Sequence, residues 1–223
     1  MAQTRIPAFI PTGFPPLDGL ILRRRITEIS GGPSSGKSLL ALRIVANAQR
    51  AGLSCAWIDA ELAFDPARAV EVGVQLERLP VARPESAEAS IEIACQLSVS
   101  GGIDLLVLDS AAALTPQLEL EAGIGDSGPG LQARVLGSGI RHLTSVTSRT
   151  ETAILVLNQI RSAGDGETTA GGPALKQYAV VRLTIEMPAE NRIRFRILKN
   201  KASEASGSFE ILLSETPEVR DTP

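Results

Sequence analysis

The stretch from Gly31 to Ser38, which reads GGPSSGKS, constrains the fold of this chain more than any other part of it. It fits the pattern G-x-x-x-x-G-K-[ST], whose glycines let backbone N–H groups curl around the oxygens of a phosphate. The pattern forms such a site when a strand precedes it and a helix follows, because the helix N-terminus adds a favourable dipole. Arg25–Ser30 (RITEIS) can form that strand, and Leu39–Arg50 is rich in good helix formers.

This loop predicts a nucleotide site. Lys37 can reach the β- and γ-phosphates of a nucleotide, and the Ser38 hydroxyl can coordinate Mg²⁺. We expect the nucleotide to contact Gly31, Gly32, Pro33, Ser34, Ser35, Gly36, Lys37, Ser38 and Leu39. Chance alone gives the pattern in roughly one chain in a hundred of this length, given the ordinary frequency of glycine. The alternative interpretation is a glycine- and serine-rich turn without a ligand.

Apolar strands alternate with helices along the chain, which is typical of an α/β fold with a mostly parallel sheet covered on both faces. The later strands are expected at Cys55–Asp59, Leu105–Leu108 and Ala153–Leu157, and helices at 86–100, at 131–150 and from Asp65-Pro66 onward. Three shorter strands at 179–186, 192–199 and 207–213 are expected to be antiparallel.

The length of 223 residues favours one domain. We expect a short irregular segment at 1–10, the core at 11–213 and a disordered tail at 214–223. The net charge of −3 argues against a protein held to nucleic acid by bulk charge alone. Cys55 and Cys95 lie in apolar surroundings, as reduced thiols of a cytoplasmic protein do, and no run has the length of a membrane span.

Polar side chains follow the ends of the predicted buried strands. Asp59, Asp109 and the pair Asn158-Gln159 occupy such positions, and ligands of parallel sheets bind beyond the carboxyl ends of the strands. Asp109 is the natural second Mg²⁺ partner, although it could instead cap a helix. Glu61 could polarise an attacking water, which is worth about 10²–10⁴-fold in rate, or be a solvated acid.

Taken together, these segments resemble the bacterial RecA recombinase family, the DNA-dependent ATPases of homologous repair. The matching stretches are GPSSGKS, IDAELAFDP, LLVLDSAAALTP, EAGIGDS, NQIR, ETTAGG, ALKQYA and KNK. Many ATPases share the phosphate loop, whereas EAGIGDS and the NQIR…ETTAGG combination are much more specific. The resemblance implies a RecA-like P-loop ATPase core that uses ATP and Mg²⁺.

The resemblance also implies a role for each matching residue. Glu61 would be the catalytic carboxylate, acting with Lys37, and Ser38 and Asp109 would form the metal site. Gln159 would contact the γ-phosphate and relay its presence into the loop that follows, whose glycines predict mobility.

The resemblance extends to the base and to a neighbouring subunit. Asp65 would lie near the adenine, with Arg68 where the family has a tyrosine, and arginine can stack on a purine. Lys199 and Lys201 match lysines that reach the ATP of a neighbouring subunit. Taken without the resemblance, they would be a solvated pair at a strand end.

Two loops of the family bind single-stranded DNA, and here they correspond to about Glu121–Gly130 and Ile160–Gly172. The residues expected to face phosphates are Arg134, Arg141, Arg161, Gly171 and Gly172. Phosphate contacts give affinity without sequence preference. Each arginine taken alone could equally be a solvated charge.

The chain departs from the family in several places. The second loop is shorter and lacks large apolar residues that could wedge between bases, and Asp165 would repel phosphate. Gly128-Pro129 replaces a bulkier pair, and Gln177 replaces a phenylalanine used in subunit contacts. Only about ten residues precede the family-like TGFPPLD, and the chain ends soon after 207–213. We therefore expect an ATPase core with reduced filament assembly.

These features favour an ATP-dependent, single-stranded-DNA-binding protein of recombination, repair and the DNA damage (SOS) response. The alternative is a nucleotide-gated adaptor that docks on a recombinase or a translesion polymerase without strand exchange of its own. The partner would accordingly be another copy of the chain or a recombinase. A small-molecule kinase is disfavoured, because no phosphoacceptor site is evident.

Overall fold

A computed structural model of the chain describes residues 8–122, 130–163, 166–170 and 172–213. Its centre is a sheet with the strand order β3-β2-β4-β5-β1-β7-β8-β9, and β6 pairs with β5 beside this path. Strands β3, β2, β4, β5, β1 and β7 are parallel neighbours, whereas β7, β8 and β9 are antiparallel. The predicted α/β class and the antiparallel end of the sheet are both confirmed.

The elements in chain order are β1 Ile26–Gly31, α1 Lys37–Arg50, β2 Cys55–Asp59, α2 Pro66–Glu71, β3 Val81–Ala82, α3 Ala87–Val99, β4 Leu105–Asp109, α4 Gln117–Glu121, α5 Leu131–Thr147, β5 Ala153–Ala163, β6 Gly166–Thr169, α6 Ala174–Tyr178, β7 Val181–Ala189, β8 Arg192–Asn200 and β9 Ser208–Leu212. Short 3-10 turns lie at Leu76–Arg78 and Ala111–Ala113. Asp65 caps α2 as predicted, since its carboxylate accepts from the backbone N–H groups of Ala67 and Arg68.

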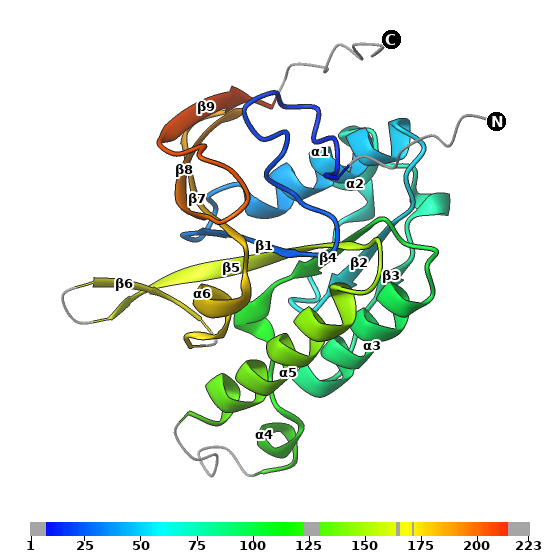
Figure 1. Cartoon of the computed structure of the whole chain (residues 1–223), viewed down its shortest axis with the longest axis vertical. Coiled ribbons are helices and arrows are strands. Elements are labelled where there is room, and N and C mark those ends of the chain that lie inside the picture. The colour runs from blue at the N-terminus through cyan, green and yellow to red at the C-terminus, as the bar shows by residue number, and fades with distance from the viewer. Residues whose placement is uncertain (1–7, 123–129, 164–165, 171, 214–223) are drawn as a thin grey trace.

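Helices cover the sheet on both faces, α1 and α2 on one and α3 and α5 on the other (Figure 1). Each face has its own apolar core, and the strands that feed both cores are buried along their whole length, as in other parallel sheets. The irregular segment before β1 adds Ile10 and Phe14 to the core under α1. Cys55 and Cys95 are free and buried, and burial raises the pKa of the Cys55 thiol to about 12. Within the described ranges, no helix has both the length and the apolar character to cross a bilayer.

The strand register brings the carboxyl ends of β1, β2 and β4 together with the middle of β5, at one rim of the sheet. Asp59 lies opposite Asp109, and Gly31 lies opposite Gln159. This rim therefore carries the phosphate loop and the polar strand ends that the sequence singles out. The convergence predicted for these residues is confirmed.

The segment after Gln159 was predicted to be a loop, and its described part forms strands instead. Strand β5 continues through Gln159 to Ala163, and its last four residues pair antiparallel with β6. Figure 1 shows this hairpin extending away from the body of the molecule. The residues of this hairpin are mostly small or polar and cannot form an apolar core. Backbone hydrogen bonds between its two strands stabilise it instead. Residues 164, 165 and 171 lie outside the described part, as do 123–129 and the tail expected to be disordered.

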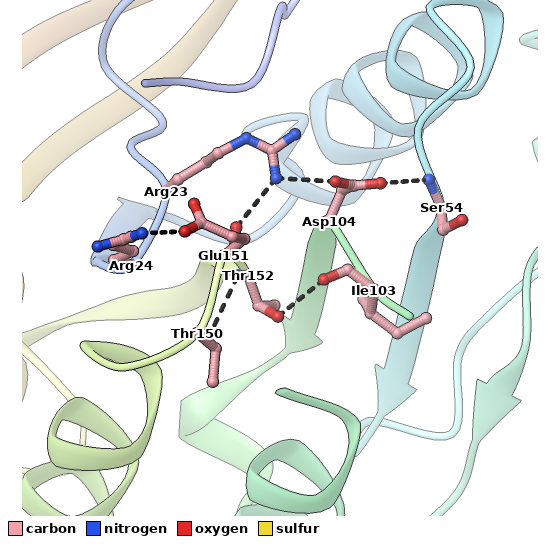
Figure 2. A network of polar contacts seen from close by, with 8 residues as sticks. All are labelled: Arg23, Arg24, Ser54, Ile103, Asp104, Thr150, Glu151 and Thr152. Atoms are coloured by element: carbon pink, nitrogen blue, oxygen red, sulfur yellow. Dashed lines mark hydrogen bonds and ion pairs between the residues drawn. The ribbon is translucent and has the colours of Figure 1, made fainter. Parts of the chain in front are cut away.

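At the amino ends of the parallel strands, a buried arginine pairs with a half-buried aspartate (Figure 2). The Arg23 guanidinium donates to the Asp104 carboxylate at 2.8 Å and to the backbone carbonyl of Glu151 at 3.0 Å. The second carboxylate oxygen of Asp104 accepts from the backbone N–H of Ser54 at 2.9 Å. Two side chains thus join the segments that lead into β1, β2, β4 and β5.

Candidate nucleotide site

Two glycines give the phosphate loop its shape. A Cβ at Gly31 would come within 2.7 Å of the Ile185 carbonyl oxygen, so only glycine fits there without a shift of the backbone. Gly36 has a φ of +84°, which other residues rarely adopt, and a Cβ there would lie 2.4 Å from the Met187 methyl group. The loop and the first turn of α1 therefore form a narrow cradle of backbone, as a phosphate site requires.

Lys37 lies at the start of α1, with its ammonium group turned back into the loop. It donates to the carbonyl oxygens of Gly31 at 3.2 Å and of Gly32 at 2.8 Å. Burial lowers the pKa of Lys37, while the nearby Glu61 and Asp109 carboxylates oppose that shift. These contacts hold the Lys37 ammonium group beside the backbone N–H groups that would bind phosphate.

Ser38 and Asp109 form the oxygen pair predicted to hold Mg²⁺. The Ser38 hydroxyl donates to the Asp109 carboxylate at 2.8 Å, across the gap between α1 and β4. Burial raises the pKa of Asp109 to about 6, the hydrogen bond from Ser38 opposes the shift, and Glu61 and Asp59 add to it. A hydroxyl and a carboxylate are the hard oxygen donors that Mg²⁺ prefers, so these residues fit that ion.

This raised pKa predicts a pH-dependent stability. Because the folded pKa of about 6 lies above the ordinary value of 3.8, the stabilisation from Asp109 is present below about pH 4 and is lost as pH rises through about 6. We expect Asp109→Asn to raise the free energy of unfolding at pH 7.5 by roughly 1–3 kcal/mol in the absence of metal. Urea unfolding in a chelator at pH 4, 6 and 7.5 measures this, and an Asn variant no more stable than wild type at pH 7.5 would contradict it.

Glu61 follows β2 and is held on two sides. Ser110 donates its hydroxyl to the Glu61 carboxylate, and the Gln159 amide donates to the same oxygen at 3.0 Å. The turn that carries Glu61 is fixed by the buried Asp59 carboxylate, which accepts from the backbone N–H groups of Ala63 and Phe64. These contacts aim a carboxylate into the space beside the phosphate loop.

A cavity of about 500 Å³ joins these groups. It is lined by Pro33, Ser34, Ser35, Gly36, Lys37, Ser38, Leu39, Glu61, Arg68, Asp109, Gln159 and Met187. Most of the predicted nucleotide contacts thus surround one space, whose volume lies within the usual range of small-molecule sites. Of the remaining predicted contacts, Gly31 and Gly32 accept from Lys37 behind the cradle, and Asp65 caps the helix that presents Arg68.

Sequence reasoning missed two residues of this site, Ser110 and Met187. Ser110 follows the strand-end aspartate directly, and a polar residue there could have been noticed. Asn158, which the sequence indicated together with Gln159, is fully buried beside it. Met187 comes from the β7–β8 hairpin, far away in the sequence, and nothing in the local pattern indicates its place at Gly36.

The predicted DNA-contacting residues that the structure describes belong to α5, to β5 and to the segment that follows β6. Arg134 and Arg141 are both exposed on α5. Gly172 has a φ of +73°, and a Cβ there would come within 2.9 Å of Ala133, so the end of the second loop lies against the first turn of α5. Arg161 belongs to β5, and Gly171 lies outside the described residues.

The two lysines matched to a trans contact lie at the end of β8. The Lys199 ammonium group donates to the carbonyl oxygens of Lys176 at 2.8 Å and of Gln177 at 3.0 Å, at the C-terminal end of α6. Burial and the nearby charges of Lys201 and Arg182 lower the pKa of Lys199. Lys201 is exposed. Lys199 is thus bound within its own chain, which the sequence did not indicate.

The parallel sheet and the cradle between β1 and α1 define an α/β core of the P-loop nucleotide-binding class. A family model described as the RecA N-terminal domain matches residues 17–215, and the chain belongs to the RecA family.

Similar proteins, each called protein RecA, occur in three bacteria: Rhodospirillum rubrum (48% identical over 199 residues), Deinococcus radiodurans (45% over 210) and Methylococcus capsulatus (44% over 236). These matches cover 83%, 87% and 96% of this chain and 54%, 58% and 68% of those proteins, respectively. The chain therefore spans little more than half the length of the first two relatives.

Proposed function

We propose that this chain is a DNA-dependent ATPase core that binds single-stranded DNA in homologous recombination and repair, including the DNA damage (SOS) response, in the cytoplasm. One observation carries the proposal. Gln159 lies at the cavity, where its side chain donates to Glu61, and its backbone continues directly into the β5–β6 hairpin. A nucleotide in the cavity and DNA at the hairpin would therefore act on the same short segment.

Each residue around the cavity has its own role in ATP hydrolysis. The backbone of the phosphate loop and Lys37 bind the triphosphate, and Ser38 and Asp109 would hold Mg²⁺. Magnesium, when bound, neutralises negative charge on the phosphate oxygens. Glu61 orients a water and accepts its proton, which is the role of a general base. Gln159, now bonded to Glu61, can exchange that contact for a phosphate oxygen.

The base end of the nucleotide would lie toward Arg68. Arg68 is exposed and lines the cavity, and a guanidinium can stack on a purine ring. Asp65, which caps the same helix, would lie near the adenine. This arrangement supports ATP binding without the tyrosine that the family has at this position.

The DNA surface would combine the two loops with Arg134 and Arg141 on α5 and Arg161 on β5. Since the net charge is −3, binding depends on these local cations and on backbone amides near Gly171 and Gly172. Such contacts are independent of sequence and weaken as salt rises.

The two lysines at the end of β8 support a second copy of the chain as the binding partner. Lys199 and Lys201 would reach the ATP of a neighbouring copy, and Lys199 must first leave the carbonyl oxygens of Lys176 and Gln177. Assembly would therefore be linked to a change at α6, which follows the second DNA loop.

The test is whether single-stranded DNA raises the rate of ATP hydrolysis at low salt. We expect a clear rise in the wild type and none in Lys37→Ala. A protein that binds ATP but neither binds single-stranded DNA nor responds to it would contradict the proposal, and an adaptor that docks on another protein would then explain the fold better.

A further inference from the structure

Three polar side chains lie next to one another inside the sheet, on the adjacent strands β7, β1 and β5. They are Arg182, Glu28 and Asn158, here called the buried relay. Glu28 and Asn158 are fully buried, and the Arg182 side chain is 11% exposed. One oxygen of Glu28 accepts from the Asn158 amide at 2.8 Å, and the other pairs with Nε of Arg182. The relay crosses β1 just before the phosphate loop.

Asn158 connects this pair to the base of the hairpin. Its Nδ2 also donates to the Ala170 carbonyl oxygen at 3.1 Å, and its Oδ1 accepts from the backbone N–H of Gln159 at 2.9 Å. The Ala170 N–H in turn donates to the Gln159 carbonyl oxygen at 3.2 Å. Asn158 and Gln159 therefore close the hairpin where β6 ends, and the Gln159 side chain extends from that point to Glu61.

A charge at Glu28 is costly, because a carboxylate must leave water to reach the middle of the sheet. Burying an ion pair adds little stability compared with apolar residues of the same size. A carboxylate does, however, fix which end of the Asn158 amide points toward it, because it only accepts hydrogen bonds. With Nδ2 fixed on Glu28 and Ala170, Oδ1 remains aimed at Gln159.

We propose that Glu28 is a positioning residue: it fixes the Asn158 amide so that the state of the nucleotide, felt by Gln159, reaches the end of the β5–β6 hairpin at Ala170. This inference rests on the proposed function, in which nucleotide binds beside Gln159. It adds to the mechanism a residue on β1 that would contact neither nucleotide nor DNA. It also explains why a carboxylate is buried at Glu28, where an apolar side chain would pack equally well.

The test follows hydrogen exchange at the backbone amides of Gln159 and Ala170, with Mg·ADP and with a non-hydrolysable Mg·ATP analogue. We expect the exchange rate at Ala170 in the wild type to differ between the two nucleotides by at least about fivefold, the effect of one typical hydrogen bond. Glu28→Gln should abolish this difference while the affinity for each nucleotide stays within about twofold. Glu186→Gln, the same change at an exposed position of β7, is the matched control and should keep the difference.

A second variant separates positioning from stability. Glu28→Met with Arg182→Met removes both charges, which is often neutral or stabilising, yet leaves Asn158 without its carboxylate. We expect this double variant to unfold at a temperature close to that of the wild type and still to lack the nucleotide-dependent difference at Ala170.

The outcomes distinguish the inference from the proposed function. The inference is overturned if Ala170 in the wild type exchanges equally with both nucleotides, or if the double variant keeps the difference. If the difference depends on Glu28 but single-stranded DNA does not stimulate hydrolysis, the inference stands and the proposed function fails.

Discussion

Replacing Glu61 with glutamine is expected to lower kcat for ATP hydrolysis by about 10²–10⁴-fold, the usual worth of a general base. The side chain keeps its size, and its amide oxygen can still accept from Ser110 and Gln159, so the fold and the affinity for ATP should be little changed. What is lost is the ability to accept a proton from water. Steady-state hydrolysis, together with a direct measurement of nucleotide affinity, separates the two effects.

The matched control for this prediction is Glu71→Gln, at an exposed position at the end of α2. It should leave kcat and affinity unchanged. A Glu61→Gln protein with kcat within about twofold of the wild type would show that another group activates the water, and that Glu61 only supports Gln159.

Replacing Asp104 with alanine is expected to lower the free energy of unfolding by roughly 2–4 kcal/mol, because it leaves the Arg23 charge buried without its counter-ion. The Arg23 side chain is only 4% exposed, and the N–H of Ser54 loses its acceptor in the same change. For a chain of this size that loss corresponds to a fall in Tm of about 5–15 °C. Thermal unfolding followed by circular dichroism measures it.

The neighbouring ion pair provides a matched control, visible beside Arg23 in Figure 2. Arg24 pairs with Glu151 at the surface, and exposed pairs contribute little to stability. Arg24→Ala should therefore leave Tm nearly unchanged. If Asp104→Ala unfolds at the same temperature as Arg24→Ala, the Arg23–Asp104 pair does not contribute significantly to the stability of the fold.

The parts of the fold that could be predicted from sequence are those with a strong local pattern. Continuous apolar runs predicted β2, β4 and the first half of β5. The phosphate loop predicted a strand before it and a helix after it, which are β1 and α1. Strand β3 and helices α4 and α6 are at most five residues long, which is too short for a hydrophobic period to be visible. Their conformation depends on tertiary contacts.

The candidate site was predictable where a polar side chain comes directly after an apolar strand, as at Asp109 and Gln159. The hairpin was not, because Ser162, Ala163, Gly166 and Glu167 have weak strand propensity and pair with one another beyond the part of β5 that β1 covers. The buried relay was also missed. In the strand sequence ITEIS, Glu28 lies on the same face as Ile26, but a glutamate is seldom buried. Its burial results from the strands on both sides and the helices on both faces of the sheet.

The measurement that tests the central claim most directly is ATP hydrolysis at low salt with and without single-stranded DNA, with Lys37→Ala as the blank. If Gln159 joins the nucleotide cavity to the hairpin, DNA raises kcat in the wild type, the rise disappears as salt screens the phosphate contacts, and the blank stays flat. A wild-type protein that binds ATP and hydrolyses it at one rate with or without DNA would contradict the account.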